Sequence, residues 1–181
     1  MPDNTDPMDE RKRYEWESKY PPEARKIIFA EGCFLFLIFF ISLFFIFAIW
    51  REWFSSMLPL CENQVHTIKK YAYYLSSGML GGITFGMKYF YRAVARGFWH
   101  IDRKPWRYMS PFIAMAVAFI VGIMIDASLI TPQKNITTPE IISIGFLAGY
   151  FADEAVGKMY EIANVIFGKT ATNRNGNGKK E

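Results

Sequence analysis

The chain has 181 residues and a formal net charge of +4, and 51% of its residues are hydrophobic and 18% aromatic. The apolar residues are gathered into long blocks between charged connectors, which excludes a uniformly polar, disordered chain and points to membrane helices. Cys33 and Cys61 are expected at different membrane depths, which excludes a disulfide framework or a cysteine metal cluster.

The chain begins with a polar, proline-containing stretch over residues 1–26, for which we expect a flexible cytoplasmic arm. The first predicted span covers residues 31–50. Its nineteen residues from Gly32 to Trp50 carry no charge and make a helix of about 28 Å, close to the thickness of the hydrocarbon layer of about 30 Å. Phenylalanines lie on every side of this helix, which favours contact with lipid over one buried face.

Three further apolar segments follow, over residues 71–91, 110–130 and 139–157. The third segment opens with Ser110 and Pro111, a cap residue followed by a proline at the first helical position. The last segment is predicted to continue as an amphipathic stem over residues 158–168, before a disordered tail over 169–181. Residues 27–168 therefore form one predicted membrane domain. The fold class is an all-α polytopic transmembrane bundle with four spans.

Lysine and arginine are distributed unevenly between the connectors. The arm before the first span has six, the connector from Lys88 to Arg107 has six, and the end from Lys158 has five, whereas the two remaining loops have three and one. Positively charged loops stay on the cytoplasmic side. Both termini are therefore predicted to be cytoplasmic, with an even number of spans.

Glycines recur at helical spacing in two of the spans. Gly78, Gly82 and Gly86 line one face of the second span, and Gly145, Gly149 and Gly157 line one face of the fourth. Small residues at this spacing allow close approach of another helix. We expect these faces to pack on each other or on copies of the chain in a homo-oligomer.

Charged residues occur at the ends of the spans. Lys88 and Asp153 are expected at a similar depth near the cytoplasmic boundary, so that Lys88 is predicted to pair with Asp153 or Glu154 within the membrane. The alternative is that all three reach into the headgroups. Asp126, near the outer end of the third span, is a candidate for a polar pore mouth, with an interfacial position as the alternative.

The connector between the second and third spans is dense in basic and aromatic residues. These are Arg92, Arg96, Trp99, Arg103, Lys104, Trp106 and Arg107. Next to two spans, such residues favour anionic lipid headgroups over nucleic acid. His100 and Asp102 have no nucleophile beside them, and phosphate-, dinucleotide- and zinc-binding motifs are absent from the sequence, so we expect no cofactor, no metal and no enzymatic activity.

Three stretches resemble a loose group of uncharacterised, small, multi-span proteins of the bacterial inner membrane. These stretches are Gly81-Gly82, the connector Trp99-His100-Ile-Asp102-Arg103-x-x-Trp106-Arg107 leading to Pro111, and the segment from Gly145 through Lys158 to Phe167-Gly168. The resemblance covers about residues 71–168. It implies a bacterial inner membrane location and an amphipathic end of the last helix, and it transfers no activity or catalytic residue to this chain.

The sequence thus predicts a non-enzymatic integral membrane protein that self-associates or docks a partner through its glycine faces. The cytoplasmic stem and the basic connector are the surfaces expected to meet an unidentified cytoplasmic protein. A small oligomeric pore is the alternative, because it needs the same packed helices and a ring of polar groups such as Asp126 or Asp153.

Overall fold

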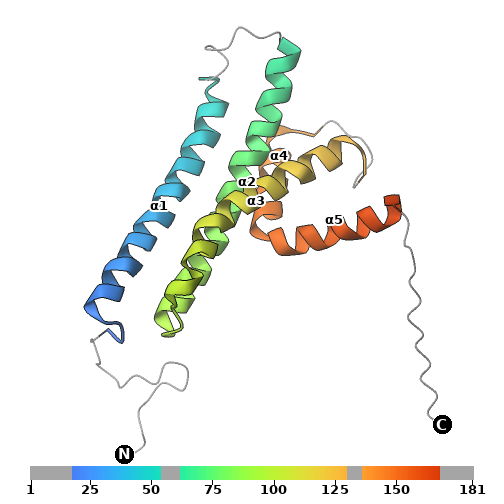
Figure 1. Cartoon of the computed structure of the whole chain (residues 1–181). Helices are drawn as coiled ribbons and strands as arrows, with labels where there is room; N and C mark the ends of the chain where they lie inside the picture. Colours follow the sequence, from blue (N-terminus) through green and yellow to red (C-terminus); the bar gives the residue numbers. More distant parts are fainter. Residues whose placement is uncertain (1–17, 54–61, 130–135, 168–181) are drawn as a thin grey trace, which may run out of the picture.

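The computed structural model describes residues 18–53, 62–129 and 136–167. Within these ranges all regular structure is helical, which confirms the all-α prediction (Figure 1). The elements are α1 (Pro22–Trp50), α2 (Glu62–Ala95), the short 3-10 helix η1 (Ile101–Arg103), α3 (Lys104–Asp126), α4 (Thr138–Tyr150) and α5 (Ala152–Phe167).

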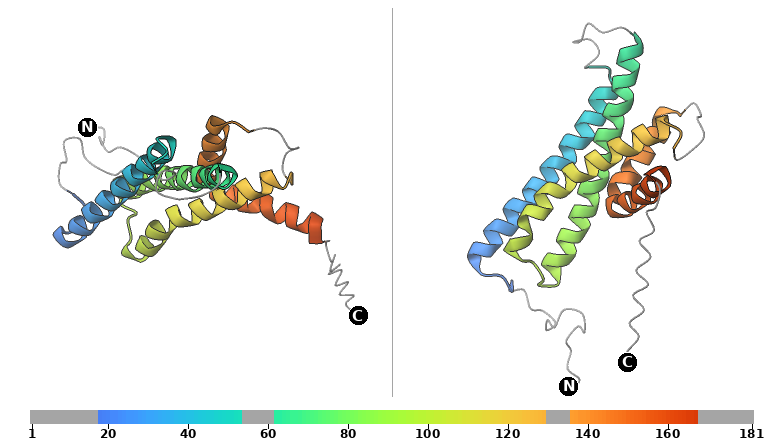
Figure 2. Two further views of the ribbon diagram at one scale, coloured as in Figure 1. Left: turned by 90° about the horizontal axis from the view of Figure 1, so that it is seen from above. Right: turned by 45° about the vertical axis from the view of Figure 1, so that its right-hand side comes forward.

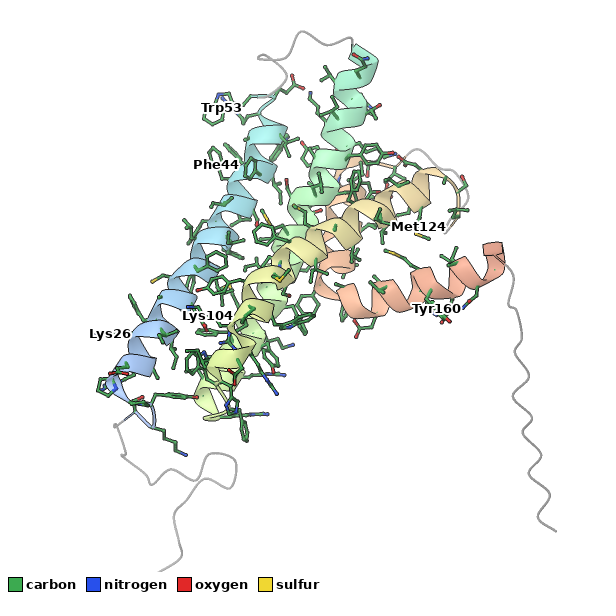
Figure 3. All side chains as sticks on the ribbon, in the orientation of Figure 1. Lys26, Phe44, Trp53, Lys104, Met124 and Tyr160 are labelled. Carbon is green, nitrogen blue, oxygen red and sulfur yellow. The ribbon has the colours of Figure 1, made fainter. Side chains whose placement is uncertain are left out.

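Helix α1 begins within the segment predicted to be a flexible arm. Pro22 occupies its first turn, where a proline is tolerated because its missing N–H has no helical partner. The helix ends at Trp50, and Glu52 follows with φ +59°, in the left-handed conformation that usually favours glycine. Phe44 projects away from the bundle (Figure 3). Exposed apolar side chains along this helix are Phe29, Phe36, Leu37, Phe40, Leu43, Phe44, Phe45, Phe47 and Trp50.

Helix α2 is the centre of the bundle. Helix α1 runs along one flank of α2, while α3 crosses in front of it and α4 lies behind it in the view of Figure 1, as the view from above in Figure 2 also shows. The core therefore lies around α2, where Tyr74 and Ile83 are fully buried.

The predicted glycine face of α2 packs mainly against α3. A Cβ on Gly78 would collide with the Cβ of Ala118, and a Cβ on Gly82 would collide with that of Ala114. Both alanines are buried in α3. Gly86, one turn further on, would accept a Cβ with no described atom within 4 Å. Two of the three predicted positions thus hold α3 close to α2.

The glycines of α4 pack against the opposite side of α2. A Cβ on Gly149 would collide with the backbone of Gly78, and a Cβ on Gly145 would collide with Ser77. Gly81 faces the backbone of α4 at Phe146 in the same way. Gly78 is therefore enclosed between α3 and α4, and the predicted packing of the two glycine faces occurs within one chain.

The fourth predicted segment is divided into two helices, which corrects the expectation of one continuous helix with a stem. Helix α4 ends at Tyr150, Phe151 has φ −107° and ψ 44°, and α5 then leaves in a different direction (Figures 1 and 2). The glycines hold α4 on α2, whereas α5 packs against α3. One straight helix cannot meet both surfaces. Gly157, on α5, has no described atom within 4 Å of its Cβ position.

By length and composition, two helical segments are apolar enough to cross a membrane, Pro22–Trp50 and Ile101–Asp126. The expectation of four such segments is corrected to two. Helix α4 has 13 residues and reaches only about 20 Å at ~1.5 Å per residue. Helix α2 is long enough, but its apolar stretch is diluted by tyrosine, serine and glycine and bounded by Lys69, Lys70 and Lys88.

Candidate functional site

A buried ion pair lies where the N-terminal part of α1 meets the beginning of α3. Glu31 is 2% exposed and Arg107 is 6% exposed. Arg107 Nε donates to Glu31 Oε2 at 3.0 Å, and Arg107 Nη2 donates to Oε1 at 3.1 Å. Trp99 Nε1 donates to the same carboxylate at 2.9 Å. A buried ion pair of this kind persists because the fork geometry and the added donor compensate its desolvation.

Arg107 and Trp99 also organise the connector. The Arg107 guanidinium lies 5.5 Å from the Trp99 ring centroid and donates to the carbonyl of His100 at 3.2 Å. The backbone N–H of Trp99 donates to Tyr20 Oη at 3.2 Å, and the Tyr20 hydroxyl donates to the carbonyl of Val94 at 3.2 Å. Helices α1, α2 and α3 are thereby joined at one end of the bundle. We call Tyr20, Glu31, Trp99 and Arg107 the lower cluster.

The lower cluster corrects the prediction that the whole connector faces lipid. Trp99 and Arg107 are buried, and both donate hydrogen bonds to Glu31. Lys104 is half-buried over the Tyr108 ring, and Arg103 donates to Tyr89 Oη at 2.7 Å. The exposed residues of the predicted set are Arg92, Arg96, Arg103 and Trp106. For these the contact with headgroups stays a prediction.

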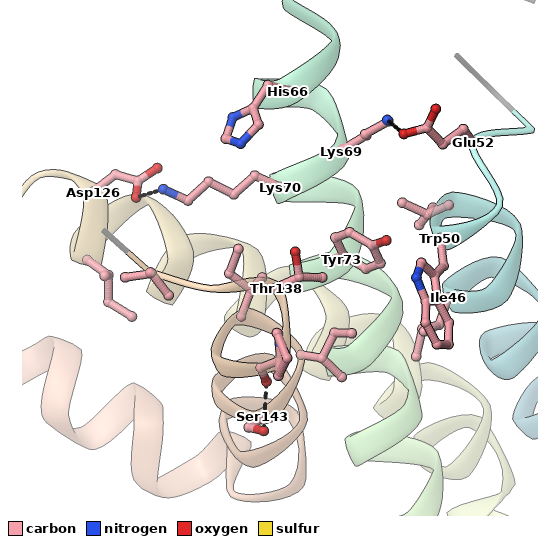
Figure 4. Close-up of a pocket in the computed structure, with 16 residues that line it drawn as sticks. Ile46, Trp50, Glu52, His66, Lys69, Lys70, Tyr73, Asp126, Thr138 and Ser143 are labelled. Atoms are coloured by element: carbon pink, nitrogen blue, oxygen red, sulfur yellow. Dashed lines mark hydrogen bonds and ion pairs between the residues drawn. The ribbon is translucent and has the colours of Figure 1, made fainter. Parts of the chain in front are cut away.

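A second group of charges lies at the opposite end of the bundle. Asp126, the last residue of α3, accepts from Lys70 Nζ through Oδ1 and from Tyr71 Oη through Oδ2, the latter at 2.8 Å (Figure 4). Lys69 Nζ lies 2.6 Å from Glu52 Oε1. We call Glu52, Lys69, Lys70 and Asp126 the upper cluster. Asp126, predicted as a pore mouth or an interfacial group, is thus partnered by α2.

The upper cluster borders a cleft of about 1130 Å³ (Figure 4). His66, Lys69 and Lys70 approach it from α2, Asp126 from α3, and Trp50 from α1. Its apolar wall consists of Ile46, Ile49, Tyr73, Ile125, Ile136, Ile141 and Ile142. Thr138 and Ser143 contribute hydroxyl groups, of which Ser143 Oγ donates to the carbonyl of Pro139 at 2.8 Å. The cleft combines a charged mouth with an apolar floor, which suits an amphipathic ligand.

A second, smaller groove of about 370 Å³ shares Ile49, Glu52 and Lys69 with this cleft. The rest of its wall is nearly all apolar, and comprises Phe45, Ile68, Ala72, Leu75, Ser76, Met79 and Met115. The Glu52–Lys69 ion pair therefore lies beside two grooves, one with a charged wall and one with an apolar wall.

Lys88, for which a pair with Asp153 or Glu154 is predicted, contacts Tyr150 in the structure, and its pairing with Asp153 stays a prediction. Lys88 Nζ donates to Tyr150 Oη at 3.1 Å and lies 5.8 Å from the centroid of that ring. Glu154 is exposed, and no ion pair joins it to Lys88 among the described side chains. The side chain of Asp153 lies outside the described part of the structure. Tyr150 had no place in the predicted site because it is uncharged.

The charge-free stretches of α1, α2 and α3 agree in length. No charged residue lies between Glu31 and Arg51, between Lys70 and Lys88, or between Arg107 and Asp126. These intervals correspond to about 30, 27 and 28 Å of helix at ~1.5 Å per residue. The helices are in register at the lower end, because the Phe34 and Tyr108 ring centroids lie 4.3 Å apart.

The described residues contain no group of histidine, cysteine, aspartate and glutamate side chains suited to hold a metal ion. No family model matches the sequence, and no curated protein and no solved structure matches it. The arrangement of charges, cleft and helix faces is therefore the basis for the functional argument.

Proposed function

We propose that this chain is a non-enzymatic protein of a bacterial inner membrane, with both termini in the cytoplasm. The observation that carries the proposal is the agreement of the three charge-free intervals, at about 27–30 Å, with the hydrocarbon thickness of about 30 Å. At the two limits, Glu31 pairs with Arg107 and Lys70 pairs with Asp126, and such pairing lowers the cost of charges at the hydrocarbon boundary. The exposed aromatic side chains of α1 then face lipid.

In this proposal α1, α2 and α3 each cross the bilayer, and the shorter α4 returns to the cytoplasmic side, so that both termini lie on that side. The lower cluster lies at the cytoplasmic boundary, where the surplus of lysine and arginine places the connector. Helix α4 returns along α2 from the cleft to the level of Lys88, which Tyr150 contacts. The bend at Phe151 then allows α5 to run beside the cytoplasmic boundary instead of projecting from it.

The glycine faces support a role in building the protomer more directly than in self-association. Gly78, Gly82, Gly145 and Gly149 all meet atoms of the same chain. We therefore propose that a partner, or a second copy, docks on surfaces that this packing leaves open. Candidates are Gly86 on α2, the exposed Val156 and Tyr160 of α5, and the exposed arginines of the connector. A pore lined by Asp126 has less support, because Lys70 and Tyr71 engage its carboxylate.

Two measurements test this proposal. Alkaline carbonate extraction of bacterial membranes expressing the full chain is expected to leave the protein in the pellet, and release into the supernatant would contradict an integral location. Native mass measurement in mild detergent is expected to give the same oligomeric mass for the wild type and for folded Gly145→Ala. Loss of a wild-type oligomer on Gly86→Ala, with an unchanged thermal unfolding temperature, would identify Gly86 as part of the docking face.

A further inference from the structure

We propose that the cleft beside the upper cluster binds a zwitterionic phospholipid, with its phosphate and ammonium groups at the charged mouth and an acyl chain in the adjoining apolar groove. This inference rests on the proposed membrane location. It adds a ligand class and a binding site to that location.

The charges of the mouth favour a ligand that carries both signs. Lys69 and Lys70 supply two ammonium groups side by side on α2, and Asp126 and Glu52 supply a carboxylate on either side of them (Figure 4). A purely anionic headgroup would meet two carboxylates, and a purely cationic one would meet two lysines. A headgroup with one phosphate and one ammonium can place each charge against its opposite.

The Glu52–Lys69 pair is the part of the mouth that is open to exchange. The Glu52 side chain is 68% exposed and that of Lys69 is 27% exposed. Solvent around the exposed Glu52 carboxylate screens this ion pair, so a phosphate can approach Lys69 and an ammonium can approach Glu52. The Lys70–Asp126 pair, which also holds Tyr71, remains as the fixed side of the cleft.

The backbone at Glu52 gives independent support. Its φ of +59° lies in the left-handed region, at the helix end where glycine is the most favourable residue. A glutamate at this point retains a carboxylate beside the mouth at the expense of backbone strain, and strained positions of this kind concentrate at ligand sites.

The apolar surfaces match the remainder of a phospholipid. Ile49 lines both the cleft and the smaller groove, so that a ligand can extend from the charged mouth along α1 and α2. Trp50 lines the cleft and is 73% exposed, next to the exposed Phe47. Trp50 thus belongs both to the cleft wall and to the α1 surface that the proposed function assigns to lipid, which gives a membrane lipid a route into the cleft.

The experiment uses the full chain in mild detergent, with phosphatidylethanolamine and phosphatidylglycerol of identical acyl chains added separately and adducts counted by native mass spectrometry. The expected result is one phosphatidylethanolamine per chain at a concentration at least tenfold lower than phosphatidylglycerol requires. Ser143→Trp, which fills the cleft, should reduce this binding at least fivefold. Leu147→Trp, one turn along α4 and not in the cleft wall, is the matched control and should bind as the wild type does.

Glu52→Gln is a second variant at an exposed side chain, so its effect does not depend on how Ser143→Trp folds. It removes the partner of the ammonium group and should reduce the preference for phosphatidylethanolamine over phosphatidylglycerol at least fivefold. Equal binding of both lipids by the wild type, identical binding by Glu52→Gln, or a doubled protein mass in place of a lipid adduct would each overturn the proposal. A chain that stays in the carbonate pellet but shows one of these results refutes the lipid site alone.

Discussion

The Arg107 guanidinium contacts both carboxylate oxygens of Glu31 across 76 residues of sequence, at 3.0 and 3.1 Å, inside the helical bundle. This contact joins the beginning of α1 to the beginning of α3 and places Trp99 against both helices. Glu31 and Arg107 also mark the lower limits of the charge-free intervals of α1 and α3. The membrane proposal depends on these intervals.

Removal of one member of this pair should be far more harmful than removal of both. Arg107→Met leaves the Glu31 carboxylate buried without its cation, and the expected loss in free energy of unfolding is about 3–5 kcal/mol. The double variant Glu31→Met/Arg107→Met should recover most of that loss, because two apolar side chains then replace two buried charges. Thermal unfolding in mild detergent, followed by circular dichroism, measures the effect.

Arg96→Met, at an exposed arginine of the same connector, is the control for loss of a positive charge and should change stability by less than about 0.5 kcal/mol. If the double variant loses as much stability as the two single variants together, the pair is not the coupled unit described above.

Gly78 and Gly86 give a matched test of helix packing. Gly78→Ala places a methyl group against the Cβ of Ala118, and overpacking of this kind costs about 1–3 kcal/mol. Gly86→Ala meets no described atom within 4 Å and should change stability by no more than about 1 kcal/mol, through helix propensity. Ala118→Gly should partly rescue Gly78→Ala. Equal unfolding temperatures for both alanine variants would argue against the packing of α2 on α3.

Ser128 offers a stabilising substitution. It follows α3 with φ +55°, and the N–H of Leu129 donates to the carbonyl of Met124 at 2.9 Å, as in a helix end closed by a left-handed residue. Ser128→Gly should raise the free energy of unfolding by about 1 kcal/mol, because glycine adopts this conformation without a Cβ clash. Ala127→Gly, where φ is −75°, should instead lower it. A lower unfolding temperature for Ser128→Gly would contradict the assigned conformation.

The sequence predicts the helical class and much of the packing, because both follow from local spacing. Gly78 and Gly82 recur every four residues on one side of α2, and that side meets α3 as close-packing residues should. The bend at Phe151 escapes prediction, since apolar periodicity continues across it and only the competing surfaces of α2 and α3 separate the two helices.

The lower cluster was missed for a different reason. Glu31 lies at the edge of an apolar stretch, where a charge normally marks the end of a span. Its partner, Arg107, is 76 residues away in the sequence. Nothing local distinguishes the buried Arg107 from the exposed Arg103. One available signal is that Glu31 and Arg107 limit apolar stretches of nearly equal length, and charges at equal depth in neighbouring spans are candidates to pair.

The central claim, that α2 crosses the membrane between the two clusters, is tested most directly by labelling engineered cysteines with a membrane-impermeant maleimide. The background is Cys33→Ser/Cys61→Ser, and the probes are His66→Cys and Arg96→Cys, at exposed positions beyond opposite ends of the charge-free interval of α2. In spheroplasts with a sealed inner membrane, the maleimide should label His66→Cys. Arg96→Cys should react only after that membrane is permeabilised. Labelling of both cysteines from the same side would contradict the account.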